Sequence, residues 1–367
     1  MRQSALSFVL LVAGLGWAAS ENVQAEDAPE GADAQESGDN GQRPHREQPT
    51  WRFEFTNDFI FDSDNQFTNG FTVQKHSTVA DNLDDLQGVR IFGKGLARRL
   101  LPQDSGLLYR KAISVGQNFA TPDDLEEPDI ILDDVAYQGL LALSGSWIAF
   151  DDNRFTGYAL TIGVVGEYSF AQEVQEASHG LNDATEPQGW EHQLSNEPII
   201  NFHYMKKRKL WNKPSFDGAF NFDLGVGNYH TGIDVGLEMQ FGRKPGGFSY
   251  VADPIGRNMA YDATLPRKDG RSEFYGTLTL RAWAWAVFLP LEGNTFVDDE
   301  WTDNNTLEPE NIIGQAILGF HYVWPKWGVH ATFTVATENI DESSLPPGTS
   351  VENSFGSIMI EWRFGGD

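Results

Sequence analysis

Two stretches decide the fold class, WRFEFTNDF at residues 51–59 and QFTNGFTVQ at residues 66–74. In both, large apolar side chains alternate with polar ones, which is the period of a β-strand. A short polar loop joins them, so the pair predicts a hairpin with aromatic side chains on one face. Asn57, Asp58 and Thr68 then gather at the turn end of the hairpin. An amide, a carboxylate and a hydroxyl at one rim can bind a cation and orient a polar substrate, but an ordinary polar hairpin tip has the same composition.

The rest of the chain repeats this pattern, in segments rich in Phe, Trp, Tyr, Val, Ile and Gly that acidic and Gly/Pro/Asn loops separate. The last segment ends on Phe364, as outer-membrane barrel strands commonly end on an aromatic residue, although Gly365-Gly366-Asp367 follow it. We expect twelve strands, at about residues 51–60, 67–77, 109–120, 136–150, 155–169, 198–209, 216–227, 231–242, 273–288, 312–324, 327–338 and 353–364.

An even strand number, an export signal, no cysteine and aromatic strand ends favour a transmembrane barrel. The mean hydropathy of −0.39 is compatible with one, because only alternate residues of a barrel strand face lipid. The predicted fold is therefore all-β, an antiparallel transmembrane β-barrel of about twelve strands with long extracellular loops. A soluble secreted β-sandwich or lectin-like protein is the alternative that the strand pattern leaves open.

The N-terminal residues predict export. An apolar run over residues 5–19 follows Met1-Arg2, and Val23-Gln24-Ala25 has the small-x-small form of a cleavage site. We expect residues 1–25 to be a signal peptide rather than an uncleaved anchor helix. Residues 26–50 are acidic and almost free of apolar side chains, which predicts a disordered leader, and residues 51–367 form the barrel domain.

The composition of the 367 residues excludes several chemistries. With no cysteine, the chain has no disulfide, thiol nucleophile or cysteine-ligated metal. The net charge of −27 repels nucleic acid, so no nucleic-acid partner is expected. A phosphorylated lipid would need a divalent cation to bridge it to such a surface.

Loop lengths give the expected orientation. If the N-terminus is periplasmic, the short links 151–154, 210–215 and 325–326 all lie on the periplasmic side, as barrels prefer. Two connections, 78–108 and 243–272, are long on that side, and part of each can be strand or periplasmic helix. The extracellular loops are then 121–135, 170–197, 289–311 and 339–352.

The loop over residues 170–197 emerges at the same rim as Asn57. It opens with helix-forming residues, and Gln172, Gln175 and His179 would share one helical face. A histidine presented there is a candidate general base, because imidazole titrates near neutral pH. Simple solvent exposure of His179 is the alternative.

A second histidine of this loop, His192, competes for the same role. Its neighbours Trp190 and Gln193 indicate a structural position, so His192 ranks below His179.

Six short motifs, in this order and at this spacing, resemble the LpxR-type lipid A deacylases, and the similarity runs from about Trp51 to Phe364. They are Thr56-Asn57-Asp58-Phe59, Phe67-Thr68-Asn69-Gly70, Gln117-Asn118-Phe119-Ala120-Thr121-Pro122, Asp133-Asp134-Val135-Ala136-Tyr137-Gln138-Gly139, His179 with Gly189-Trp190-Glu191-His192-Gln193-Leu194, and Leu291-Glu292-Gly293-Asn294-Thr295-Phe296.

The resemblance implies a twelve-stranded outer-membrane barrel that removes the 3′-acyloxyacyl chain of lipid A in a calcium-dependent reaction. Lipid A of lipopolysaccharide and the surrounding membrane lipids would be its partners, and the cell outer membrane its location. The oligomeric state is left open. The family's essential residues are an Asn-Asp pair, a Thr, a His and a Glu, and the first four correspond here to Asn57, Asp58, Thr68 and His179.

This chain departs from the family pattern at two places. An ungapped count from His179 reaches Thr185, so Glu186 takes the glutamate's role only after a shift of one residue. The family's Asp-Asp-Arg-Pro-Tyr-Ala-Gly stands here as residues 133–139 with Val135 in place of the arginine. Arginine is a natural anchor for phosphate or carboxylate, so a different substrate position, a different substrate class or a loss of activity is conceivable.

The leading hypothesis is calcium-dependent ester hydrolysis, with His179 deprotonating a water molecule and Glu186 orienting the imidazole or completing the metal shell. Calcium would be held by Asp58 with oxygens of Asn57, Thr68 and Glu186. One alternative is a non-enzymatic barrel, a pore or a lipid-binding protein. Another is an outer-membrane phospholipase that uses a serine beside its histidine. Ser178 precedes His179, but adjacent residues of a helix point in different directions.

Overall fold

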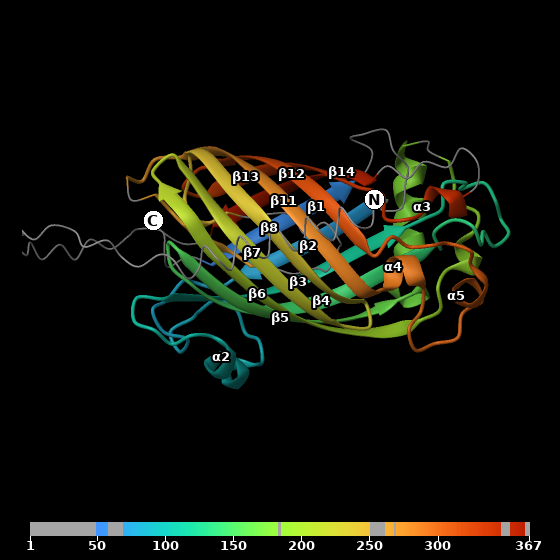
Figure 1. Ribbon diagram of the computed structural model, residues 1–367, viewed down its shortest axis with the longest axis horizontal. Helices are drawn as coiled ribbons and strands as arrows, with labels where there is room; N and C mark the ends of the chain where they lie inside the picture. Colours follow the sequence, from blue (N-terminus) through green and yellow to red (C-terminus); the bar gives the residue numbers. More distant parts are fainter. Residues whose placement is uncertain are drawn as a thin grey trace, which may run out of the picture.

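The computed structural model describes residues 49–57, 69–182, 185–249, 261–267, 269–345 and 353–363. Twelve strands close into one antiparallel barrel, which confirms the predicted fold (Figure 1). The predicted signal peptide and nearly all of the predicted leader lie outside the described residues, as do Asp58 and Thr68. The barrel strands are β1 (Thr50–Asn57), β2 (Asn69–His76), β3 (Leu108–Ala120), β4 (Gln138–Phe150), β5 (Arg154–Val165), β6 (Glu197–Lys213), β7 (Phe216–Gly227), β8 (His230–Arg243), β11 (Glu273–Phe288), β12 (Ile312–Val323), β13 (Trp327–Ala336) and β14 (Asn353–Arg363).

Most strand boundaries agree with the sequence within a few residues, and two do not. The predicted strand 155–169 ends early, at Val165, because the chain turns there: Gly166 has φ 98° and Phe170 has φ 58°. β6 runs on to Lys213, four residues beyond its predicted end, through an irregularity in its pairing with β7.

The remaining elements lie in the connections. Among the described residues, no helix is long and apolar enough to cross a membrane. The elements in the connections are α2 (Lys94–Leu100), η2 (Glu167–Ser169), α3 (Ala171–Asn182), η3 (Trp190–His192), α4 (Leu289–Glu292), α5 (Glu300–Asn304), η4 (Glu342–Ser344), and a two-stranded sheet of β9 (Gly246–Phe248) and β10 (Ala263–Leu265).

The outer face of the barrel is apolar, because successive residues of a strand point to opposite faces. On β1, Phe53 and Phe55 are exposed while Arg52 is buried and Glu54 half-buried. A belt of tryptophans marks one end, where the rings of Trp327 and Trp362 stack at 5.1 Å. Such an outer surface is suited to lipid. Other exposed apolar side chains of this band are Phe71, Val73, Val115, Leu143, Leu160, Ile162, Ile200, Leu224, Val226, Ile233, Leu280, Leu318, Phe320, Val335, Ile358 and Ile360.

The two ends of the barrel differ in their connections. The turn end carries the tight links at 151–153, 214–215 and 324–326 together with two long connections, 77–107 and 244–272. The loop end carries α3, α4 and α5 (Figure 1). This is the distribution that the loop lengths predicted.

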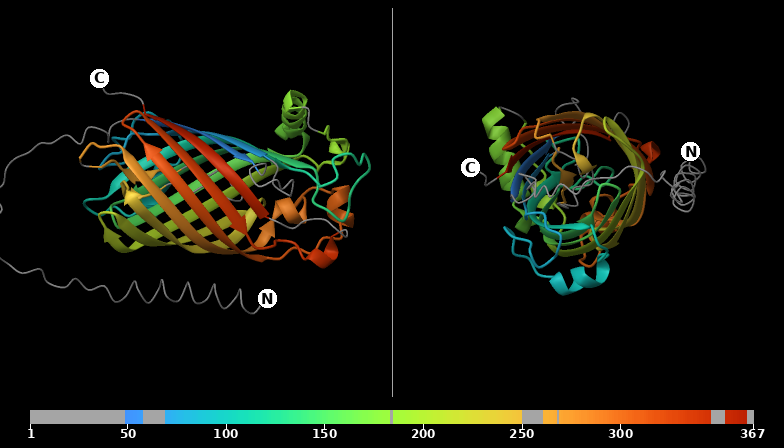
Figure 2. Two further views of the ribbon diagram at one scale, coloured as in Figure 1. Left: turned by 90° about the horizontal axis from the view of Figure 1, so that it is seen from above. Right: turned by 90° about the vertical axis from the view of Figure 1, so that its left-hand side faces the viewer.

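The described residues of the connection 244–272 include the short hairpin β9–β10, which lies in the lumen. Asp262 pairs with Arg52 of β1 and Arg110 of β3, both of which point inward. Phe248 packs against inward-facing Phe155 of β5 with ring centroids 5.9 Å apart. Yellow-orange chain is visible within the ring of strands in Figure 2, right. The β9–β10 part of this long turn-side connection is therefore accommodated inside the barrel.

The other long connection, 77–107, folds onto the outside of the wall. Its Leu83, Leu101 and buried Ala97 pack with Trp147 and Tyr158, which point outward from β4 and β5. α2 accordingly lies outside the outline of the ring in both Figure 1 and Figure 2.

At the loop end an apolar cluster spans the lumen. Leu140 of β4 and Trp283 of β11 both belong to it, although their strands lie on nearly opposite sides of the ring. Loop residues Leu289, Trp301 and Ile340 fill the space between them. With the hairpin at one end and this cluster at the other, the described residues occupy the lumen and argue against an open pore.

Candidate functional site

Asn57 and His179, two residues of the predicted site, lie at the loop-end rim on the outer side of the barrel wall. Asn57 is the last residue of β1, and it alternates with outward-facing Phe53 and Phe55. Its side chain is half-buried. Strand pairing aligns Asn57 with Asn69 of β2, and Asn69 in turn with Phe119 of β3. At about 4.8 Å per strand, Asn57 and Phe119 are about 10 Å apart across the rim.

α3 docks on the same outer face, two strands further around the rim. Gln117 Nε2 of β3 donates to the carbonyl oxygen of Ser169 at 2.6 Å. Gly139 of β4 lies directly beneath the start of α3, where a Cβ atom would stand 2.2 Å from Cβ of Ala171. Only glycine permits this approach, so Gly139 is required for the close packing of α3 on β4. Figure 2, right, shows α3 outside the ring of strands.

A buried tryptophan holds α3 and the end of its loop together. Trp190, the first residue of η3, is 1 % exposed and packs against Phe119 and Tyr137 at ring distances of 6.3 and 5.1 Å. Its Nε1 donates to Oε1 of the fully buried Gln175 at 2.7 Å. The sequence indicated a structural position for Trp190 and placed Gln175 on the same helical face as His179. It did not indicate the hydrogen bond between Trp190 and Gln175.

His179 stands one turn after Gln175 on α3 and is partly exposed. Its Nδ1 lies 2.5 Å from the backbone carbonyl oxygen of Thr185. A carbonyl oxygen can only accept, so Nδ1 carries the hydrogen and Nε2 of the neutral ring keeps its lone pair. The loop that follows α3 therefore fixes the tautomer that a general base requires.

Glu186 follows Thr185 directly in the chain, and its predicted role, orienting the imidazole or completing the metal shell, stays a prediction. Its side chain is exposed, and the partner of His179 Nδ1 is the Thr185 carbonyl rather than the Glu186 carboxylate. Gln188 Nε2 donates to the backbone oxygen of Glu186 at 3.2 Å. Because the Thr185 carbonyl already contacts Nδ1, this arrangement favours the second of the two predicted roles of Glu186, that of an oxygen ligand.

The predicted calcium ligands are placed only in part. Asn57 lies at the rim, and Glu186 lies on the loop after α3, whereas Asp58 and Thr68 fall outside the described residues. In the part of the chain that the structure describes, no three His, Asp or Glu side chains gather as a metal site. The predicted donor set consists of oxygens only, which is the ligand type that calcium prefers.

Val135 occupies the position where the family pattern has arginine, and it is buried in the apolar cluster of the loop end, 1 % exposed. The neighbouring Asp134 accepts hydrogen bonds from the backbone N–H groups of Asp123 and Val135 at 2.8 and 2.7 Å. Burial nevertheless raises the pKa of Asp134 above its ordinary value. These surroundings disfavour charge, so the valine is part of the packing.

Ser178 and His192, the alternative candidates for the nucleophile and the base, both have structural partners. The hydroxyl of Ser178 donates to the carbonyl oxygen of Gln175 at 2.9 Å, one turn back along α3. His192 ends η3, where its backbone N–H donates to Gly189 and its Nε2 lies 3.6 Å from Glu191. These contacts favour a structural role for both residues.

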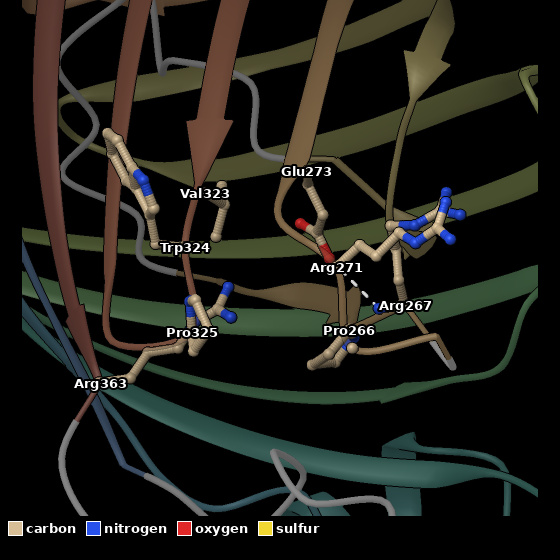
Figure 3. A pocket seen from close by; sticks show the side chains of 9 residues that line it. Pro266, Arg267, Arg271, Glu273, Val323, Trp324, Pro325 and Arg363 are labelled. Carbon is tan, nitrogen blue, oxygen red and sulfur yellow. Dashed lines mark hydrogen bonds between the residues drawn. The ribbon is translucent and has the colours of Figure 1, made fainter.

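A pocket is present at the other end of the molecule. It lies at the turn end, between the start of β11 and the ends of β12 and β14 (Figure 3). Arg267, Glu273 and Arg363 contribute to its lining, and the backbone N–H of Arg267 donates to Glu273 Oε1 at 3.3 Å. The whole length of the barrel separates this pocket from α3, so it does not belong to the candidate site.

Comparisons with known proteins agree with this architecture. The family model described as "Outer membrane protein LpxR" matches residues 8–364. Among solved structures, LpxR from Salmonella typhimurium superposes with a TM-score of 0.64 at 13 % identity, covering 86 % of this chain and 100 % of that one.

Other barrels are less similar. The β domain of the Bordetella autotransporter BrkA gives a TM-score of 0.39 at 8 % identity, covering 86 % of this chain and 99 % of that one. The KdgM porin gives 0.33 at 5 % identity, with 87 % and 99 % covered. A search of curated protein sequences found no match.

Proposed function

Because this chain belongs to the LpxR family of outer-membrane proteins, we propose that it is a calcium-dependent hydrolase that removes an ester-linked acyl chain, the 3′-acyloxyacyl chain, from lipid A. The observation that carries this proposal is the arrangement of His179 on α3. Its Nδ1 is held by the carbonyl oxygen of Thr185, and α3 packs on the same outer rim that bears Asn57.

The position of the site suits a lipid substrate. α3 and Asn57 lie on the outer face of the wall, directly beyond the apolar band that includes Phe55 and Phe71. A lipid whose acyl chains lie along this band would present its ester bonds at the rim. The substrate then reaches the site from the membrane and has no need of the filled lumen.

His179 supplies the proton transfers in this proposal. Nε2 takes a proton from a water molecule as the water oxygen adds to the ester carbonyl carbon. The resulting imidazolium returns the proton to the sugar oxygen as the ester bond breaks, which yields a free acyloxy fatty acid and a sugar hydroxyl. The Thr185 carbonyl stabilises the imidazolium through its bond to Nδ1 and keeps the ring in place.

Asn57, Asp58, Thr68 and Glu186 would hold the calcium ion and position the substrate beside His179. When bound, calcium polarises an ester carbonyl and stabilises negative charge on its oxygen. The chain's net charge of −27 makes such a cation useful for a phosphorylated lipid as well.

The test is mass spectrometry of lipid A after incubation with the purified protein in calcium or in chelator. We expect a calcium-dependent loss of acyl mass that falls by about 10²–10⁴-fold in His179→Ala. His192→Ala is the matched control, since it removes the other histidine of the same loop. Unchanged lipid A with a folded, heat-modifiable wild-type barrel would contradict the proposal.

A further inference from the structure

The connection 77–107 exposes apolar and basic side chains at a place where a membrane barrel meets its bilayer. Phe92 is fully exposed, at 102 % of its reference area, and Leu96 is 44 % exposed. Both belong to a segment that is attached to the outer wall through Ala97 and Leu101.

The segment is rigidly held, so this exposure does not result from a loose loop. Trp147 Nε1 donates to the carbonyl oxygen of Phe92 at 3.1 Å, and the Tyr158 hydroxyl donates to that of Gly93 at 3.0 Å. Gly93, which precedes α2, has φ 99°, a conformation that favours glycine. The wall therefore fixes the direction in which Phe92 and α2 project.

The location is the edge of the lipid-facing band. Trp147 lies four residues from exposed Leu143 along β4, about 13 Å, and Tyr158 lies two residues from exposed Leu160 along β5, about 7 Å. α2 thus covers the wall just where the apolar band ends, on the turn side. Tight turns belong to the periplasmic side of outer-membrane barrels, so α2 lies at the level of the inner leaflet.

The charge of this segment is opposite to that of the whole chain. Residues 90–101, RIFGKGLARRLL, contain four basic side chains and no acidic one, whereas the chain carries −27. Lys94 and Arg98 pair with Asp84. Arg90 and Arg99 are exposed, and no acidic side chain among the described residues pairs with either.

Helical geometry separates the two kinds of side chain. At 100° per residue, Leu96 and Arg98 lie on opposite flanks of buried Ala97, and Arg99 points away from the wall. An apolar flank with a basic flank beside it is the pattern of a helix that lies in the membrane interface. Anionic headgroups are the partners that such a basic flank attracts.

We propose that residues 90–101 form an interfacial anchor, in which Phe92 and Leu96 enter the acyl region of the inner leaflet and Arg90 and Arg99 bind anionic phospholipid headgroups. The anchor is independent of the ester hydrolysis proposed above. It makes the lipid that surrounds the turn end a partner of the protein, in addition to any substrate at the loop end.

The absence of cysteine makes the test direct, because one introduced cysteine is the only labelling site. Phe92→Cys carries an environment-sensitive fluorophore, and Ser105→Cys, exposed on the same connection, is the matched control. Both are placed in nanodiscs of phosphatidylcholine and phosphatidylglycerol at one fixed ratio. Only the identity of the brominated, quenching lipid is changed.

We expect strong quenching at position 92 and little at 105, with brominated phosphatidylglycerol about twofold or more as effective as brominated phosphatidylcholine. Arg90→Gln with Arg99→Gln should bring that ratio to about one while leaving the barrel heat-modifiable. Quenching at position 92 no greater than at 105 would overturn the anchor. Equal quenching by the two lipids in the labelled protein that keeps Arg90 and Arg99 would overturn the binding of anionic headgroups.

Discussion

Trp190 Nε1 donates to Oε1 of Gln175 at 2.7 Å, and Gln175 stands one helical turn before His179. Through this bond, and through the contact of Trp190 with Phe119, the position of the proposed base is tied to the barrel wall. Trp190 and Gln175 can therefore affect a reaction at His179 by positioning α3, without contacting the substrate.

Trp190→Phe should lower the rate of deacylation about tenfold through kcat, with a smaller effect on KM. The change keeps an aromatic ring but leaves the buried Gln175 oxygen without its donor, at a cost of about 1–3 kcal/mol. Hydrogen exchange of α3 should speed up in parallel. Trp211→Phe at the turn end is the control, and unchanged exchange in α3 would show that the bond does not hold the helix.

Glu186→Gln should raise the calcium concentration needed for half-maximal activity while leaving the rate at saturating calcium within a few-fold. The Thr185 carbonyl already binds His179 Nδ1, so the base keeps its tautomer without the carboxylate. A calcium titration of activity measures both quantities. A large loss of rate at saturating calcium, with no change in the titration midpoint, would instead make Glu186 a partner of the base.

Val135→Arg, which restores the family arginine, should destabilise the loop end rather than improve activity. The side chain is 1 % exposed in an apolar cluster, and an uncompensated buried charge costs about 3–5 kcal/mol. The midpoint of the heat-modifiable gel shift measures this loss. Asp133→Arg, at the exposed neighbouring position, should be tolerated. A Val135→Arg variant of undiminished stability would contradict the packing role.

Asp262→Asn should open a conducting path through the barrel. The carboxylate pairs with both Arg52 and Arg110, so its loss leaves two buried guanidinium groups with less compensation and loosens the hairpin β9–β10. Planar bilayer recordings should show almost no current for the wild type and measurable steps for the variant. Asp269→Asn, which breaks an exposed pair with Arg267, should stay silent.

The sequence predicted the barrel well because a strand that faces lipid on one side and a polar lumen on the other alternates strictly. The segments 216–227 and 273–288 were predicted to the residue. For the two long turn-side connections the sequence indicated only that part of each can be strand or helix, and α2 and β9–β10 lie there. Their length on that side could not be explained, since their apolar residues belong to tertiary contacts. Leu83 belongs to one cluster with Trp147, and Phe248 packs against Phe155. In each pair the two residues are far apart in the sequence.

The candidate site was predicted less completely. A helix at the start of the loop 170–197 was expected, and α3 is present there. The role of Thr185 could not be inferred, because it is the backbone carbonyl, common to every residue, that binds His179. The roles of Asn57, Asp58, Thr68, His179 and Glu186 in catalysis and calcium binding stay predictions.

The hairpin in the lumen also constrains how the barrel is assembled. Arg52 of the first strand binds Glu361 of the last strand at 2.7 Å and Asp262 of the hairpin at 3.3 Å. The Arg52 guanidinium thus links the junction of the first and last strands to the hairpin inside the barrel. A ring that closed while the hairpin was still outside would leave Arg52 and Arg110 without their partner Asp262. We therefore expect the pairing of the first and last strands to be coupled, through these charges, to the entry of the hairpin into the barrel.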